Sequence, residues 1–172
     1  YVKLIQNFLD FGVELDGIGI QAHMRNAVSP PRILRALDKL AKFGLPLVIT
    51  EYDHLIFHEE SQARYMRDFL TAVFSHPAVE GFFMWGFWDG MHFRDNAPLY
   101  HRDWRLKKGG REYLDLVFRE WTTQGHAVTD AHGLIEIAGF PGEYVFEVDG
   151  DGVPRHYRGQ LEGGTAPLSV VV

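Results

Sequence analysis

The stretch LPLVITEYD at residues 45–53 decides the fold, because an apolar run ends there directly in a carboxylate. A short apolar run that follows a Gly and a Pro is typical of a buried strand. Glu51 then stands at the end of this strand, which is where a barrel of parallel strands places its chemistry. The stretch therefore predicts a strand whose C-terminal end presents a functional acid.

Two other runs end in the same way. IGIQAH at residues 18–23 ends in a histidine, and FFMWGFWD at residues 82–89 ends in indoles and an acid. Helical patterns separate the three runs, so we expect right-handed crossovers and a parallel sheet. His23, Glu51 and Trp85 are then predicted to lie on one rim of an α/β fold. The predicted helices run to about residue 14 and over residues 30–43, 59–75 and 107–121.

The pattern of apolar and polar residues changes after residue 121. Helical periodicity disappears, and short β-type runs alternate with Gly and Asp turns. This pattern predicts a small antiparallel β unit over residues 122–172, which follows a polar linker. The strands are expected at residues 134–137, 144–148, 156–161 and 168–172.

Composition limits the class of partner. The 172 residues carry a formal charge of −6, with no basic stripe for a phosphate backbone and no apolar stretch long enough for a membrane. We therefore expect a neutral, soluble partner and neither nucleic acid nor membrane. The chain has no Cys, which excludes a disulfide scaffold and thiolate metal sites but leaves the cellular compartment open.

The rim residues suit the cleavage of a glycosidic bond with retention, which needs one carboxylate as nucleophile and a second as acid. Glu51 suits the nucleophile, and His23 and Asp53 could orient it and keep it ionised. Trp85 and Trp88 offer flat faces for a pyranose. The alternative interpretation is that Glu51 is a surface residue that follows a buried strand and has no catalytic role.

Three motifs, DGIGIQAH at residues 16–23, ITEYD at 49–53 and WGFWD at 85–89, resemble the second half of a glycoside hydrolase family 10 endo-xylanase, in that family's order. The resemblance implies that residues 1–121 form about the last three β/α units of a (β/α)8 TIM barrel, and that the chain begins inside a larger protein. It also implies secretion or a periplasmic location. The likeness continues through Gln62, Ala63 and Tyr65 and through residues 97–100, 103–104 and 113–117.

The resemblance also implies roles for single residues. Glu51 is the nucleophile of a double displacement on β-1,4-xylosidic bonds in xylan, and His23 and Asp53 are its hydrogen-bonded neighbours. Gln21 is a sugar or network contact, and Trp85 is a wall of the subsite that holds the attacked xylose.

The chain departs from the family pattern at three points. The family's acid/base, a Glu in an Asn-Glu pair, has no counterpart, so the chain alone is expected to be inactive or weak. Tyr52 replaces a smaller apolar residue, and Phe93 stands where an indole commonly closes the sugar site. A partial barrel exposes sheet edges and apolar faces, so we expect association with a second copy or with the missing half of the barrel. The missing acid leaves open a catalytically silent carbohydrate-binding or assembly fragment.

Other candidate sites are interpreted as structural. Residues 130–133, 139–140 and 142–148 resemble the small β extension of some family 10 enzymes, and we expect a docked structural appendage there rather than a sugar-binding face. His54 and His58 have metal-ligand spacing without an assured helical face or a third ligand, and Asp149 and Asp151 fit turn chemistry better than a calcium loop. No metal and no cofactor are expected.

Overall fold

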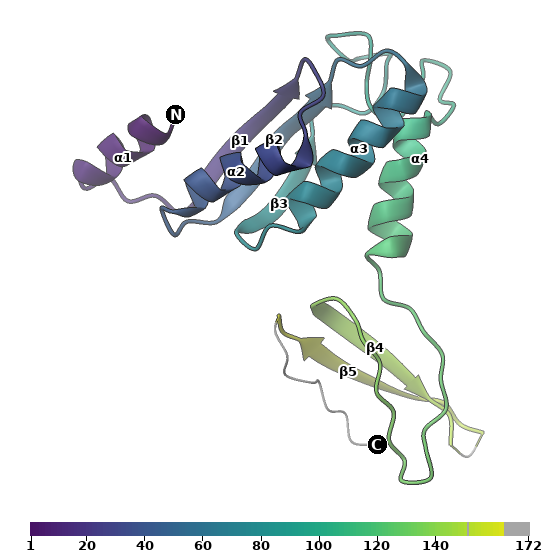
Figure 1. Ribbon diagram of the computed structural model, residues 1–172. Helices are drawn as coiled ribbons and strands as arrows, with labels where there is room; N and C mark the ends of the chain where they lie inside the picture. Colours follow the sequence, from purple (N-terminus) through teal and green to yellow (C-terminus); the bar gives the residue numbers. More distant parts are fainter. Residues whose placement is uncertain (151, 164–172) are drawn as a thin grey trace. The chain divides into compact units, whose positions relative to one another are not determined.

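The computed structural model describes residues 1–150 and 152–163 (Figure 1). Its contacts divide the chain into two units, Tyr1–Leu116 and Val117–Val172. Asp151 and the strand predicted at residues 168–172 lie outside the described residues.

The first unit contains the predicted alternation of helices and strands. Its strands form one parallel sheet in the order β1-β2-β3. The first helix is shorter than predicted and ends at Asp10, just before Gly12 takes a left-handed φ of 74°. The elements are α1 (Val2–Asp10), β1 (Ile18–Met24), α2 (Pro30–Ala41), β2 (Leu47–His54), α3 (Glu59–Phe74), β3 (Val79–Met84) and α4 (Lys108–Asp115). A π-helical turn (Leu116–Glu120) follows α4, and the boundary between the units falls after its first residue.

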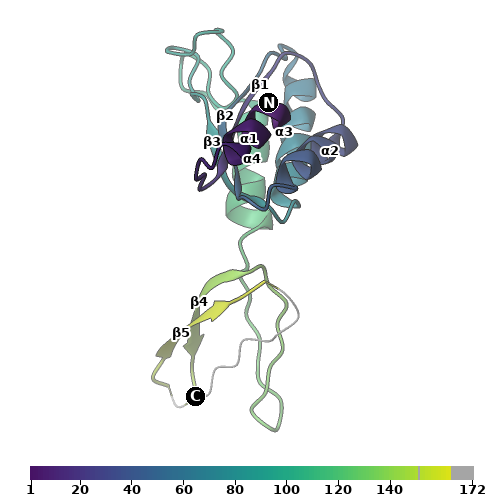
Figure 2. The ribbon, with the colours of Figure 1, turned by 90° about the vertical axis from the view of Figure 1, so that its left-hand side faces the viewer.

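The hydrophobic core lies between one face of this sheet and the helices α2 and α3, which run along that face (Figures 1 and 2). The apolar residues of α2 recur at helical spacing, and they bury one stripe against the strands. The opposite face of the sheet is open, and Phe83 on it is 61% exposed. The largest fully buried apolar side chains are Tyr52, Phe69, Leu47, Ile49, Met66 and Leu116.

A β-bulge in β2 decides which way the predicted catalytic acid points. Ile20 pairs with Ile49 and Gln21 pairs with Glu51, so Thr50 is an extra residue in the ladder. In a regular strand without the bulge, residues 49 and 51 would share a face, and Glu51 would lie with Ile49 against the helices. The bulge moves Glu51 to the open face.

Gly19 makes room for this bulge. A Cβ atom added at Gly19 would lie 3.0 Å from Cγ2 of Thr50, which is closer than ordinary packing permits. Tyr52, two residues after Thr50, returns to the helix-covered face and is fully buried. The bulge therefore serves both the site and the core.

The second unit contains a two-stranded antiparallel sheet, β4 (Gly142–Val148) and β5 (Arg155–Leu161). The prediction of a strand at residues 134–137 is wrong. Leu134 closes a turn onto Asp130: its carbonyl accepts from the Asp130 N–H, its own N–H donates to Oδ1 of Asp130, and it is 67% exposed. This segment forms no ladder with another strand among the described residues. In neither of the described ranges does any helix combine the length and the apolar character that crossing a membrane requires.

Candidate functional site

The side chains predicted to form the site meet at the C-terminal ends of β1 and β2. Nε2 of Gln21 donates to Oε1 of Glu51 at 2.9 Å, and Nε2 of His23 lies 3.1 Å from Oε2 of the same carboxylate. Both carboxylate oxygens of Glu51 are therefore held from β1. The Glu51 side chain is still 21% exposed, so a ligand on the open face can reach it.

Behind this group lies Asp53, whose side chain is fully buried. Nδ1 of His23 lies 2.9 Å from its Oδ2, and Nη1 of Arg94 donates to its Oδ1 at 2.7 Å. His23 thus faces a carboxylate with each ring nitrogen, and it can donate to both only when the ring carries both protons. The chain Arg94–Asp53–His23–Glu51 fixes the position of the exposed carboxylate.

Arg94 and His92 are site residues that the sequence patterns did not reveal. His92 is buried with Nε2 3.6 Å from Oδ2 of Asp53, and burial lowers its pKa despite that carboxylate. Both residues belong to the loop after β3, where no periodicity marks a functional position. The single available signal was the position of Arg94 next to Phe93, which the family resemblance had singled out.

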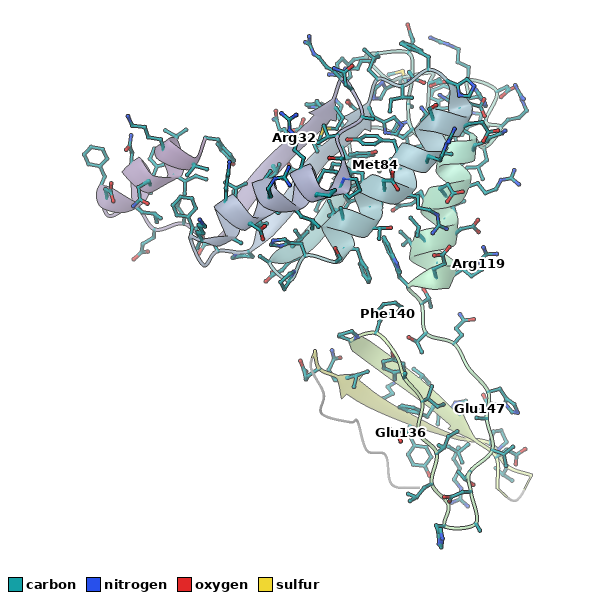
Figure 3. All side chains as sticks on the ribbon, in the orientation of Figure 1. Arg32, Met84, Arg119, Glu136, Phe140 and Glu147 are labelled. Carbon is teal, nitrogen blue, oxygen red and sulfur yellow. The ribbon has the colours of Figure 1, made fainter. Side chains whose placement is uncertain are left out.

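β3 ends at Met84, which Figure 3 labels, and two aromatic residues that follow it in the sequence contact the site. Trp85 and Phe93 both contact the ring of His23 edge-on, with centroids 5.9 and 6.0 Å away. The two aromatic residues are 46% and 63% exposed. The guanidinium of Arg94 lies 4.8 Å from the centroid of Phe93 and supports that ring from one side.

Trp88 belongs to a different cluster in this loop. Its ring stacks on Trp104 at 4.7 Å, with 9° between the planes, and its indole N–H donates to the carbonyl of Arg102. Its stacking partner, Trp104, lies outside the group of residues around Glu51. A direct role for Trp88 in holding the attacked sugar stays a prediction.

A buried polar network secures the loop after β3. Nζ of Lys107, 4% exposed, donates to Oδ1 of Asp89 and to the carbonyl of Ala97, both at 2.8 Å. The amide N–H of Ala97 also donates to Oδ1 of Asp89. Oδ1 of Asp89, the acid that ends the third predicted run, is therefore engaged within this loop.

Burial of His54, which directly follows Asp53 in β2, makes the stability of the fold depend on pH. It is hydrogen-bonded to the hydroxyl of Tyr52 at 2.8 Å, and burial lowers its pKa to about 4, with the positive charge of Lys107 adding to the effect. Between pH 6.5 and 4 the unfolded chain binds a proton at His54 that the folded chain does not. Stability therefore falls as the pH drops through this window, by about 3 kcal/mol in total, and the contribution levels off below it.

Urea unfolding at pH 7 and pH 4 measures this effect. From pH 7 to pH 4 the free energy of unfolding should decrease in both proteins, and the decrease should be about 3 kcal/mol smaller in His54→Gln than in the wild type. His132→Gln, at an exposed turn, is the matched control and should follow the wild type. Equal acid losses in wild type and His54→Gln would contradict the prediction.

The group around Glu51 contains a second carboxylate, Asp53, and cleavage with retention would need a second acid beside the exposed one. Asp53 cannot act as that acid, because it is buried and both its oxygens are taken by His23 and Arg94. Over residues 1–150 and 152–163, no group of three or more metal-ligating side chains is found. His54 is buried against Tyr52, whereas His58 is exposed before α3.

Comparisons with known proteins identify relatives of this chain. Residues 1–111 match the profile of Glycosyl hydrolase family 10. The chain is 35% identical over 97% of its length to the anti-sigma-I factor RsgI6 of Acetivibrio thermocellus, and it covers 22% of that protein. It is 32% identical over its whole length to endo-1,4-beta-xylanase 2 of Arabidopsis thaliana, and it covers 16% of that protein. The chain thus spans about a fifth of the length of these relatives.

Solved structures show the same likeness. Native xylanase 10B from Thermotoga maritima superposes with a TM-score of 0.62 at 25% identity, over 69% of this chain and 41% of that one. Xylanase 10B from Thermotoga petrophila, solved in complex with xylobiose, superposes with a TM-score of 0.61 over the same shares. The likeness supports the predicted part of an α/β barrel.

Proposed function

Because this chain belongs to glycosyl hydrolase family 10, we propose that it is the nucleophile-bearing part of a retaining endo-1,4-β-xylanase. The observation that carries the proposal is the Glu51 carboxylate, held at both oxygens by Gln21 and His23 yet still open to a ligand. In this proposal Glu51 attacks the anomeric carbon of a β-1,4-linked xylose and displaces the leaving sugar. Water then hydrolyses the covalent glycosyl-enzyme.

The hydrogen-bonded chain behind Glu51 has a role in this reaction. Gln21 and His23 fix the carboxylate plane, so the attacking oxygen meets the sugar in one orientation. Asp53, backed by Arg94, holds His23 in turn. Trp85 and Phe93 present apolar faces beside this group and suit the C–H surface of the bound xylose.

The acid that protonates the leaving oxygen lies outside this chain in our proposal. Retaining enzymes place it about 5–5.5 Å from the nucleophile. Asp53 is excluded by its burial and its two partners. We therefore expect this chain alone to hydrolyse xylan weakly or not at all, and to gain activity when an N-terminal barrel half supplies the acid.

An activated substrate tests the nucleophile without the missing acid, because fluoride leaves without a proton. The chain is incubated with 2-deoxy-2-fluoro-β-xylobiosyl fluoride and analysed by mass spectrometry. We expect a covalent adduct on the peptide that contains Glu51. Binding without an adduct would contradict the hydrolase proposal and favour the catalytically silent carbohydrate-binding alternative.

The open sheet supports a further part of the proposal, which concerns the partner. The outer strands β1 and β3 each pair on one side alone within their described sheet, and Phe83 is exposed on the uncovered face. Free strand edges and exposed apolar faces promote association. We expect the chain to self-associate or to bind the missing barrel half. Sedimentation velocity measures both. A chain that stays monomeric alone and in the presence of that half would contradict this expectation.

Residues 122–172 are assigned a structural role in the same proposal, as an extension of the catalytic part. Tyr144 stacks on Phe146 and donates its hydroxyl to the carbonyl of Phe140, so its ring is engaged within the extension. Unchanged xylan binding by Tyr144→Ala would support this role, whereas a loss of binding in a folded variant would contradict it.

A further inference from the structure

The loop after β3 carries a second aromatic surface that the reaction at Glu51 does not use. Trp104 lies at its centre and contacts the rings of Phe87, Trp88 and Tyr100 at centroid distances of 6.4, 4.7 and 6.0 Å. We call these four residues the indole platform. Trp104 and Phe87 are 57% and 49% exposed, so the platform is open to solvent.

The platform is built rigidly, although it is exposed. The backbone N–H of Tyr100 donates to the carbonyl of Phe87, and the N–H of Asp89 donates to that of Tyr100. The Trp88 ring covers Gly90 so closely that a Cβ atom there would lie 2.1 Å from it. These constraints keep the stacked rings from collapsing into the core.

Trp104 has an unfavourable backbone conformation. Its φ of 64° lies in the left-handed region, which favours glycine and is rare for a bulky side chain. Such conformations persist where the surroundings enforce them, and they cluster at ligand-binding sites. Here the strained turn places a large apolar ring in solvent, a position that stability alone does not favour.

Charged groups flank the exposed ring on the same turn. Asp103 and Arg105 adjoin Trp104 in the sequence and form an ion pair with each other at 2.6 Å. Their side chains are 56% and 74% exposed. An apolar face bordered by exposed donors and acceptors matches a pyranose, which has a C–H face and a rim of hydroxyl groups.

We propose that the indole platform binds a β-1,4-linked pyranose chain, as a contact separate from the group around Glu51. Trp85, at the end of β3, contacts His23, and three residues later Trp88 supports the platform. One loop thus connects the two surfaces, and a long oligosaccharide can engage both. The choice of ligand rests on the proposed function, whereas the platform itself rests on the contacts above.

Calorimetric titration of the 172-residue chain with xylohexaose and xylobiose tests the proposal. Trp104→Gly removes the ring and suits the left-handed backbone, so it should keep its melting temperature. We expect it to bind xylohexaose about tenfold more weakly, with xylobiose binding unchanged. Trp104→Phe keeps an aromatic face and should bind xylohexaose nearly as the wild type does.

Phe11→Ala is the matched control, because Phe11 is an 86% exposed aromatic residue outside the platform. The proposal is overturned if Trp104→Gly binds xylohexaose as tightly as Phe11→Ala does. If that result came together with labelling of Glu51, it would contradict sugar binding by the indole platform and leave the proposed function intact. Weaker binding of xylohexaose by Trp104→Gly without any labelling of Glu51 would support the indole platform and contradict the proposed nucleophile.

Discussion

Glu51→Gln is expected to slow the release of phenol from an activated aryl β-xylobioside by at least about 10⁴-fold. The aryl group leaves without a proton, so this first step depends on the nucleophile and not on the missing acid. The amide keeps the size of the side chain but cannot attack the anomeric carbon. The burst of released phenol, followed by stopped-flow absorbance on the chain alone, measures the rate.

Two comparisons make this result specific to Glu51. Glu60→Gln removes an exposed carboxylate of α3 that pairs with Lys108, and it should keep the wild-type burst. Glu51→Ala with added azide should recover phenol release, because the small anion can enter the vacated space and yields the inverted glycosyl azide. A wild-type burst from Glu51→Gln would mean that another residue is the nucleophile.

Lys107→Met is expected to lower the free energy of unfolding by about 3–5 kcal/mol, because it leaves the carboxylate of Asp89 largely buried without its cation. The Asp89 side chain is 12% exposed, and its remaining close partner is the N–H of Ala97 at 2.7 Å. The carbonyl of Ala97 also loses a donor. Urea denaturation followed by tryptophan fluorescence measures the loss.

The adjacent lysine provides the control. Lys108 is 53% exposed and pairs with Glu60 on the surface, so Lys108→Met should leave the unfolding midpoint nearly unchanged. The double variant Lys107→Met/Asp89→Leu removes the unpaired charge and should recover part of the loss. If Lys107→Met and Lys108→Met unfold at the same urea concentration, the buried pair does not stabilise the loop.

Much of this arrangement could be predicted from the sequence, because its signals are local. Apolar runs that end in His23 and Glu51 predicted parallel strands and their common rim, and the structure brings these side chains within 3.1 Å. The helices of the first unit follow from their apolar spacing. A resemblance in three ordered motifs then pointed to the family that the comparisons show.

The features of the fold and of the site that could not be predicted depend on contacts between residues far apart in the sequence. Arg94 reaches Asp53 across 41 positions, and Lys107 reaches Asp89 across 18, both through loop geometry that no periodic pattern encodes. The strand predicted at residues 134–137 failed for a related reason, because its β-type composition finds no partner strand in the described part of the chain. The stacking of Trp88 on Trp104 is a further contact that the sequence pattern did not reveal, and a contact of Trp88 with the attacked sugar stays a prediction.

The extra residue at Thr50 has a consequence for anyone who edits this strand. β2 consists of two halves whose odd and even positions have opposite meanings, so Ile49 and Tyr52 share the core while Glu51 stands apart. A graft that keeps residues 49–52 but pairs them in a regular ladder would place Glu51 on the face of Ile49 and turn Tyr52 away from the core. The irregular pairing of this strand is thus as much a part of its information content as the identity of its glutamate.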